Sequence, residues 1–118
     1  MNEIIKDDIH NVIKTIPDNS IDFIYTDPPF AITSAKWDKP LKWKELFPEM
    51  WRVLKPDGVI ALYSSIPFTY TLLRESPEPP KYHFTWIKNN STGFFQVKFQ
   101  PLRETEEILI YYKKKGRY

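Results

Sequence analysis

A short strand followed by a rigid corner is encoded by residues 21–30, IDFIYTDPPF. The first six of these residues are rich in β-branched and aromatic side chains, which predicts a buried strand that ends at Asp27. Pro28 and Pro29 fix φ at two successive positions and hold the chain in a defined corner. The carboxylate of Asp27 and the ring of Phe30 are therefore expected side by side at the end of a strand.

Helical periodicity appears on both sides of this strand. Isoleucines at three- and four-residue steps predict a short amphipathic helix over residues 9–16, which ends at Pro17. Residues 41–54 carry apolar side chains at the same spacing and are expected to form a second helix. The segment KPDG at 55–58 is expected to stop that helix.

Three further strands are predicted downstream, over residues 59–63, 82–87 and 108–112. Pro67 can open a helix that reaches Arg74. This order of elements predicts one α/β domain over residues 1–118, with a mainly parallel sheet and an antiparallel last pair of strands. Ligands of such sheets bind beyond the carboxyl ends of the strands, which is where Asp27 falls.

The composition excludes several classes of protein. Hydrophobic residues make up 42% of the 118 residues and aromatic residues 16%, which supports a packed core and argues against disorder. The absence of cysteine excludes disulfides, thiolate metal sites and cysteine nucleophiles. His10 and His83 have no companion ligands at metal spacing, so no metal is predicted. The apolar runs are too short to cross a bilayer, and a soluble, cytoplasmic protein is expected.

The corner after the first strand can bind a flat heterocycle that carries an exocyclic amine. Asp27 and the carbonyl of Pro28 can accept hydrogen bonds from the two N–H groups of the amine, while Phe30 stacks on the ring. Accepting both bonds draws the nitrogen lone pair out of conjugation with the ring and prepares it to attack an electrophilic methyl group. The alternative is a strand-end turn in which Asp27 caps the next segment.

The corner also resembles a known catalytic motif. DPPF at residues 27–30 is similar to the Asp/Asn/Ser-Pro-Pro-aromatic motif of DNA amino-methyltransferases. Other segments resemble phage-type adenine-N6 enzymes of the beta motif order, namely Lys36-Trp37-Asp38, Val53–Gly58, Ser65–Phe68, Trp86–Lys88, Thr92–Phe94, Pro101–Arg103 and Glu106–Leu109. The similarity runs from about Ile4 to Lys115. It implies a partial Rossmann-like methyltransferase fold.

The resemblance implies methyl transfer from S-adenosylmethionine to the N6 amine of adenine in DNA. An aspartate at the first motif position goes mainly with adenine in that family, whereas serine is usual in cytosine-N4 enzymes, which remain the second possibility. The catalytic candidates are then Asp27, Pro28, Pro29 and Phe30. A prokaryotic or viral origin and a role in restriction–modification would fit such an enzyme.

Other candidate residues follow from the same resemblance. Asp8 stands where relatives carry an aspartate that helps to hold the adenosine half of the methyl donor. The alternative for Asp8 is the N-cap of the predicted helix over residues 9–16. Four residues are candidates for contacts with DNA, with ordinary surface charge or local packing as the alternative: Lys36, Trp37, Lys88 and Arg103.

One part of the family pattern is not found. Relatives continue into a glycine-rich loop that cradles S-adenosylmethionine, whereas this chain has three separated glycines, Gly58, Gly93 and Gly116. We therefore expect the chain alone to bind the donor weakly. Besides DNA, its expected partner is a second copy or a separate cofactor-binding subunit. The alternative is a catalytically inactive remnant that serves as a nucleic-acid or protein binding module.

Overall fold

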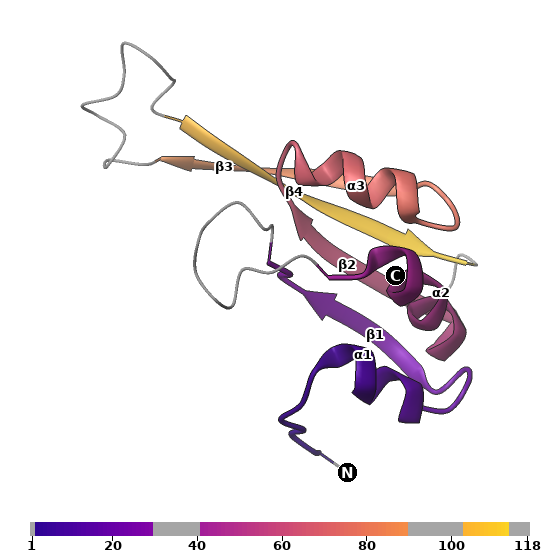
Figure 1. Cartoon of the computed structure of the whole chain (residues 1–118). Coiled ribbons are helices and arrows are strands. Elements are labelled where there is room, and N and C mark those ends of the chain that lie inside the picture. Colours follow the sequence, from indigo (N-terminus) through magenta and orange to yellow (C-terminus); the bar gives the residue numbers. More distant parts are fainter. Residues whose placement is uncertain (1, 30–40, 90–102, 114–118) are drawn as a thin grey trace.

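The structure is a computed structural model that describes residues 2–29, 41–89 and 103–113. Helices and strands alternate along most of the chain (Figure 1). In order they are α1 (Ile9–Val12), the 3₁₀ helix η1 (Ile13–Thr15), β1 (Ile21–Thr26), α2 (Trp43–Val53), β2 (Leu54–Ser64), α3 (Phe68–Glu75), β3 (Tyr82–Asn89) and β4 (Arg103–Tyr112).

The strands form one mixed sheet in the order β1-β2-β4-β3. β1 pairs parallel with β2, and β4 pairs antiparallel with both β2 and β3. The expectation of a mainly parallel sheet was therefore wrong. β1, β2 and β3 do run in one direction, but β4 lies between β2 and β3 and so makes two of the three pairings antiparallel. The predicted antiparallel last pair is confirmed.

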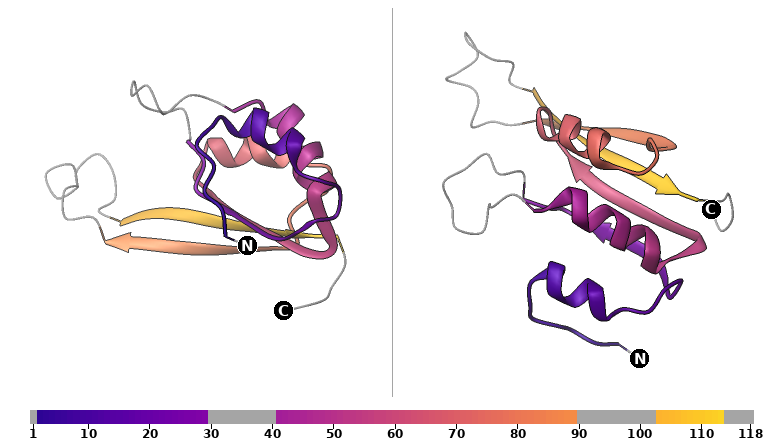
Figure 2. Two further views of the ribbon diagram at one scale, coloured as in Figure 1. Left: turned by 90° about the horizontal axis from the view of Figure 1, so that it is seen from below. Right: turned by 45° about the vertical axis from the view of Figure 1, so that its right-hand side comes forward.

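All the helices lie on one face of this sheet (Figure 2). The buried face of α2 carries Trp43, Leu46, Phe47, Met50 and Val53, in agreement with the predicted apolar stripe. These side chains pack against the inward-facing residues of β2 and β4, which are Ile60, Leu62, Leu109 and Tyr111. The core is therefore a single layer between the helices and one side of the sheet.

Several element boundaries differ from the prediction, most of all at β4, which begins at Arg103 and not at residue 108. The first helix is only four residues of α-helix followed by a turn of 3₁₀ helix. β2 begins at Leu54, so the segment KPDG is part of a strand and not a loop. Gly58 is required there because a Cβ atom would lie 2.6 Å from Cδ1 of Leu54 and 3.0 Å from the carbonyl oxygen of Asp22 on the neighbouring strand.

Arg52 joins α2 to the segment that precedes β1. Its guanidinium donates to the carbonyl oxygens of Ile13 at 2.8 Å and Ile16 at 2.7 Å. It also pairs with the carboxylates of Asp18 at 2.7 Å and Glu49 at 2.8 Å. The hydrogen bonds to Glu49 and Asp18 raise the pKa of Arg52 further. One side chain thus positions the entry into β1.

Among the residues that the structure describes, no helix is both long and apolar enough to span a membrane.

Candidate active site

The corner after β1 lies at the edge of the sheet that the sequence predicted. β1 and β2 are parallel, and Thr26 at the end of β1 pairs with Leu62 near the end of β2. Asp27 follows directly and is exposed, whereas Pro28 is buried and Pro29 is half-buried. The buried proline anchors the corner in the fold, and the carboxylate beside it remains accessible from solvent.

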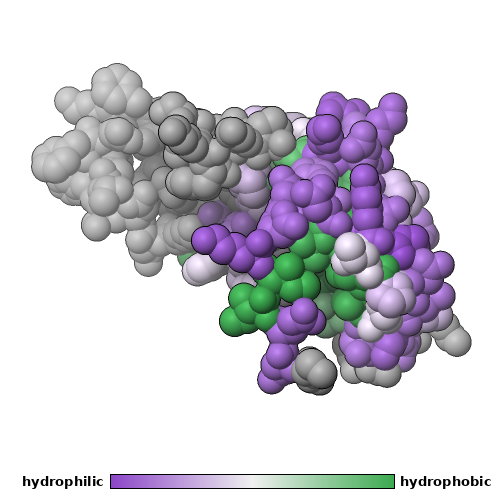
Figure 3. Space-filling model, turned by 60° about the horizontal axis from the view of Figure 1, so that its bottom comes forward, coloured by the Kyte–Doolittle hydropathy of each residue, from purple (hydrophilic) through white to green (hydrophobic). Residues whose placement is uncertain are grey.

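An apolar hollow of about 430 Å³ lies beside this corner. Its lining includes Asp27, Pro28 and Pro29 together with apolar side chains of α1, η1 and α2. Figure 3 shows this side of the molecule, where apolar side chains gather between polar ones. Trp43 also lines the hollow, and its buried Nε1 has no hydrogen-bond partner among the described residues. The hollow therefore combines an apolar wall with the carboxylate of Asp27.

Two tyrosines approach the corner from the opposite face of the sheet. The hydroxyls of Tyr25 and Tyr63 share a hydrogen bond of 2.6 Å, and their rings meet edge to face at 5.5 Å. The hydrogen bond with Tyr25 and desolvation raise the pKa of Tyr63, and the negative charges of Asp27 and Glu106 act in the same direction. Tyr63 therefore keeps its hydroxyl proton to higher pH than an ordinary tyrosine.

Asp8 caps α1, as one of its two predicted roles required. Its carboxylate accepts from the backbone N–H of His10 at 2.8 Å and lies 2.7 Å from Nδ1 of the same histidine. The backbone hydrogen bond from His10 lowers the pKa of Asp8, so the charged, capping form persists to lower pH than for an ordinary aspartate. The second role, in holding a methyl donor, stays a prediction.

His10 connects the two helices that form the walls of the hollow. Its Nε2 accepts a hydrogen bond of 3.0 Å from the backbone N–H of Lys42, directly before α2. Because Nε2 accepts, the proton of the neutral ring belongs on Nδ1, where it is donated to Asp8. His10 thus links Asp8 to Lys42 through two hydrogen bonds. Among the described residues, no group of side chains suitable for a metal ion occurs.

The side chains of the other predicted site residues are not described by the structure. Phe30, Lys36 and Trp37 lie outside the described residues. Lys88 and Arg103 lie on β3 and β4 at the end of the hairpin that these strands form, where Lys88 pairs with Glu104 and Asn89 with Arg103, but the structure describes only their backbone. Their proposed contacts with DNA stay predictions.

Sequence reasoning missed Tyr25, Tyr63 and His10. Tyr25 could have been found from its position in the predicted strand, because it lies two residues before Asp27 in the sequence. Its partner on β2 could not have been found in this way, because the register between the two strands is not visible in the sequence. The role of His10 depends on the packing of α1 against α2.

Comparison with known proteins adds a second line of observation. No family model matches the chain. The chain is 41% identical over 66 residues to the Type II methyltransferase M.BglII of Bacillus subtilis, which is 51% of this chain and 18% of that protein. It is 34% identical over 71 residues to YubD of Escherichia coli (strain K12), named as a methylase, which is 53% of this chain and 31% of YubD.

Two solved structures share the fold. One is M1.HpyAVI in complex with SAM, with a TM-score of 0.65 and 24% identity over 95% of this chain and 55% of that chain. The other is the cytosine-N4-specific PvuII DNA methyltransferase, with a TM-score of 0.61 and 17% identity over 92% of this chain and 48% of that chain. M.BglII is thus named a methyltransferase, YubD a methylase and the PvuII enzyme a DNA methyltransferase. The chain spans less than a third of these curated relatives and about half of these two solved chains.

Proposed function

We propose that this chain is the base-binding half of a DNA amino-methyltransferase that methylates the N6 amine of adenine with S-adenosylmethionine. The observation that carries the proposal is the position of Asp27-Pro28-Pro29. The corner directly follows β1, at the carboxyl edge of the sheet, and lines an apolar hollow. The similarity to methyltransferases by sequence and by fold supports methyl transfer, while the choice of adenine rests on the aspartate at the first motif position, Asp27.

The geometry suits binding of an exocyclic amine. When a target base is turned out of the helical stack, Asp27 and the carbonyl of Pro28 accept hydrogen bonds from the two N–H groups of its amine. These bonds hold the nitrogen with its lone pair directed away from the ring, and Asp27 stabilises the positive charge that the nitrogen acquires. S-adenosylmethionine, when bound, would supply the methyl group and leave as S-adenosylhomocysteine, and the methylated nitrogen would then release one proton to solvent. Phe30 stacks on the base, and Lys36, Trp37, Lys88 and Arg103 contact the surrounding DNA.

The residues of this chain fit only part of the methyl donor. Asp8 and the apolar wall of the hollow suit its adenosine half, but the three glycines are too far apart in the sequence to make a glycine-rich loop for its amino-acid end. We therefore expect the isolated chain to bind S-adenosylmethionine with a dissociation constant weaker than about 10 μM, which corresponds to about −7 kcal/mol. Isothermal titration calorimetry measures this constant, and a tighter value would show that the chain holds the whole donor.

Transfer of a methyl group is tested with a completed fold. The chain is fused to the part of M1.HpyAVI outside the 55% that matches it and incubated with DNA and isotopically labelled S-adenosylmethionine. The DNA is then digested, and its nucleosides are identified by mass spectrometry. N6-methyladenine is the expected product. N4-methylcytosine would instead support the specificity that the PvuII enzyme has, and a folded fusion that leaves DNA unmodified would support the inactive remnant.

A further inference from the structure

A single imidazole joins the two helical segments that wall the apolar hollow. His10 lies on α1, and its Nδ1 is 2.7 Å from the carboxylate of Asp8. On the other side of the ring, Nε2 accepts a hydrogen bond of 3.0 Å from the backbone N–H of Lys42, directly before α2. The side chain of His10 is 24% exposed, so the ring is largely enclosed but can still exchange protons with solvent.

The contact with Lys42 holds the beginning of α2. Lys42 is the N-cap residue of this helix, and its own side chain makes no capping hydrogen bond. Its carbonyl oxygen accepts the first hydrogen bonds of α2, from the N–H groups of Glu45 at 3.0 Å and Leu46 at 2.8 Å. The N–H of the same residue donates to His10. A side chain of α1 therefore fixes the residue from which α2 starts.

The beginning of α2 also forms part of the hollow. Leu41 and Trp43, on either side of Lys42, line the hollow together with Ile9 and Ile13 of the other segment. Because His10 binds both segments, it limits how far these apolar side chains can move apart. The width of the hollow beside the catalytic corner thus depends on the two hydrogen bonds of one ring.

The two nitrogens of this ring respond differently to a second proton. In the neutral ring, Nδ1 carries the proton and Nε2 accepts, as the two contacts require. A second proton occupies Nε2 and makes it a donor, so it can no longer accept from the N–H of Lys42. Nδ1 still donates to Asp8, now from a charged ring, and such hydrogen bonds are stronger. Protonation therefore breaks the contact with α2 and keeps the contact with Asp8.

The charged groups around His10 come from each of the neighbouring segments. They are Asp7 and Asp8 before α1, Lys14 in η1, Lys42 before α2, and Glu45 and Glu49 in α2. Glu49 is already paired with Arg52 at 2.8 Å. Asp8 is the carboxylate in direct contact with the ring. A charged His10 would therefore keep its ion pair on α1 while it loses its hydrogen bond to α2.

From these contacts we propose that His10 is a proton-controlled link, which holds the start of α2 against α1 when its ring is neutral and releases it when the ring is charged. Histidine is the usual pH switch of proteins because its charge changes between about pH 5 and 8. The link acts on the shape of the hollow and does not depend on the proposed methyl transfer.

The test uses nuclear magnetic resonance of the 118-residue chain labelled with nitrogen-15. At about pH 8, the ring should carry its proton on Nδ1, and a scalar coupling across the hydrogen bond should connect Nε2 with the amide nitrogen of Lys42. As the pH is lowered to about 5, this coupling should disappear in step with protonation of the ring. Hydrogen exchange at Lys42, Glu45 and Leu46, corrected for the intrinsic effect of pH, should then rise at least about threefold.

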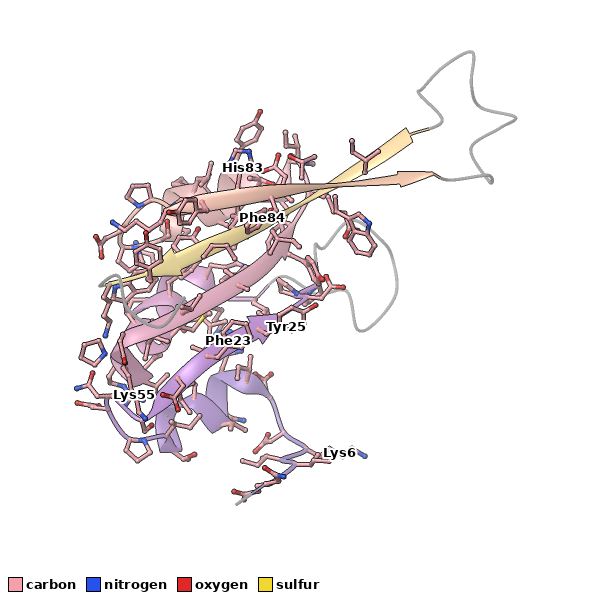
Figure 4. The ribbon with its side chains drawn as sticks, turned by 180° about the vertical axis from the view of Figure 1, so that it is seen from behind. Lys6, Phe23, Tyr25, Lys55, His83 and Phe84 are labelled. Atoms are coloured by element: carbon pink, nitrogen blue, oxygen red, sulfur yellow. The ribbon has the colours of Figure 1, made fainter. Side chains whose placement is uncertain are left out.

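Two variants of His10 separate the roles of its nitrogens. In His10→Gln the amide oxygen can replace Nε2 as the acceptor for Lys42, so protection from exchange should persist at low pH. In His10→Asn the shorter amide can donate to Asp8 but cannot reach Lys42, so exchange at the start of α2 should be fast at both pH values. His83→Gln is the matched control, because His83 is exposed and lies on β3 (Figure 4), and it should leave the pH dependence unchanged.

Three results would overturn the inference. The neutral ring could carry its proton on Nε2, the contact with Lys42 could persist after the ring is charged, or His83→Gln could abolish the pH dependence. If a variant of His10 does not fold, the titration of the unmodified chain decides, because the same spectra report ring protonation and the coupling. The measurements need neither DNA nor methyl donor, so a chain that fails to methylate DNA would contradict the proposed function and not the link.

Discussion

Replacing Asp27 by alanine in the completed enzyme is expected to lower the rate of methyl transfer by about 10²–10⁴-fold. Asp27 is proposed to act on the amine as the nitrogen becomes charged, and a residue used at that stage lowers the rate far more than it lowers binding. Phosphate contacts dominate affinity for DNA, so the dissociation constant of the DNA complex should stay nearly unchanged. Single-turnover methylation and fluorescence anisotropy measure the two quantities.

Asp27→Asn is the sharper variant for the same question. The amide keeps one acceptor oxygen and the approximate shape of the side chain but loses the negative charge, so partial activity is expected. Normal turnover of Asp27→Ala would refute the catalytic role. Unfolding of Asp27→Ala would instead support the alternative in which Asp27 serves as a cap at the end of the strand.

Replacing Phe47 by alanine is expected to lower the free energy of unfolding by about 3–5 kcal/mol. Phe47 is fully buried, and its ring contacts those of Trp43 at 5.2 Å and Tyr111 at 5.7 Å. Domains of this size have about 5–15 kcal/mol in total. The variant should therefore be largely or partly unfolded at 37 °C, as measured by urea denaturation with tryptophan fluorescence.

Phe23→Ala is the matched control for this prediction. It removes the same atoms from a ring that is 57% exposed on the side of the sheet away from the helices (Figure 4). We expect it to change the free energy of unfolding by less than about 1 kcal/mol. Equal losses in the two variants would show that the sheet is buried on both sides in the free chain, contrary to the arrangement of the helices.

Much of the fold was predictable because its elements are strongly periodic. The apolar stripe of residues 41–54 predicted α2 to within two residues, and residues 21–26 predicted β1 without error. The relative directions of neighbouring strands were not predictable from the same periodic patterns. β4 follows β3 in the sequence but is inserted between β2 and β3 in space, and this order depends on which faces pack together.

The candidate site was predictable only where it is local in sequence. Asp27, Pro28 and Pro29 are adjacent, so their corner could be derived from two fixed φ angles and the end of a strand. The hollow beside them is formed by α1 and α2, which are brought together by tertiary packing. Asp8 could be read in two ways, and the structure bears out the cap because a cap is a local contact of neighbouring residues.

The contacts of Arg52 make the attachment of the N-terminal segment more sensitive to salt concentration than the packing of the sheet is. The segment before β1 is attached to α2 partly through the ion pair between Arg52 and Asp18, whose carboxylate is 69% exposed. Dissolved ions screen such pairs, with a Debye length of about 3 Å at 1 M salt, while they leave buried apolar contacts intact or strengthen them. Concentrated salt would therefore loosen the α1 wall of the hollow while the sheet beneath it stays formed.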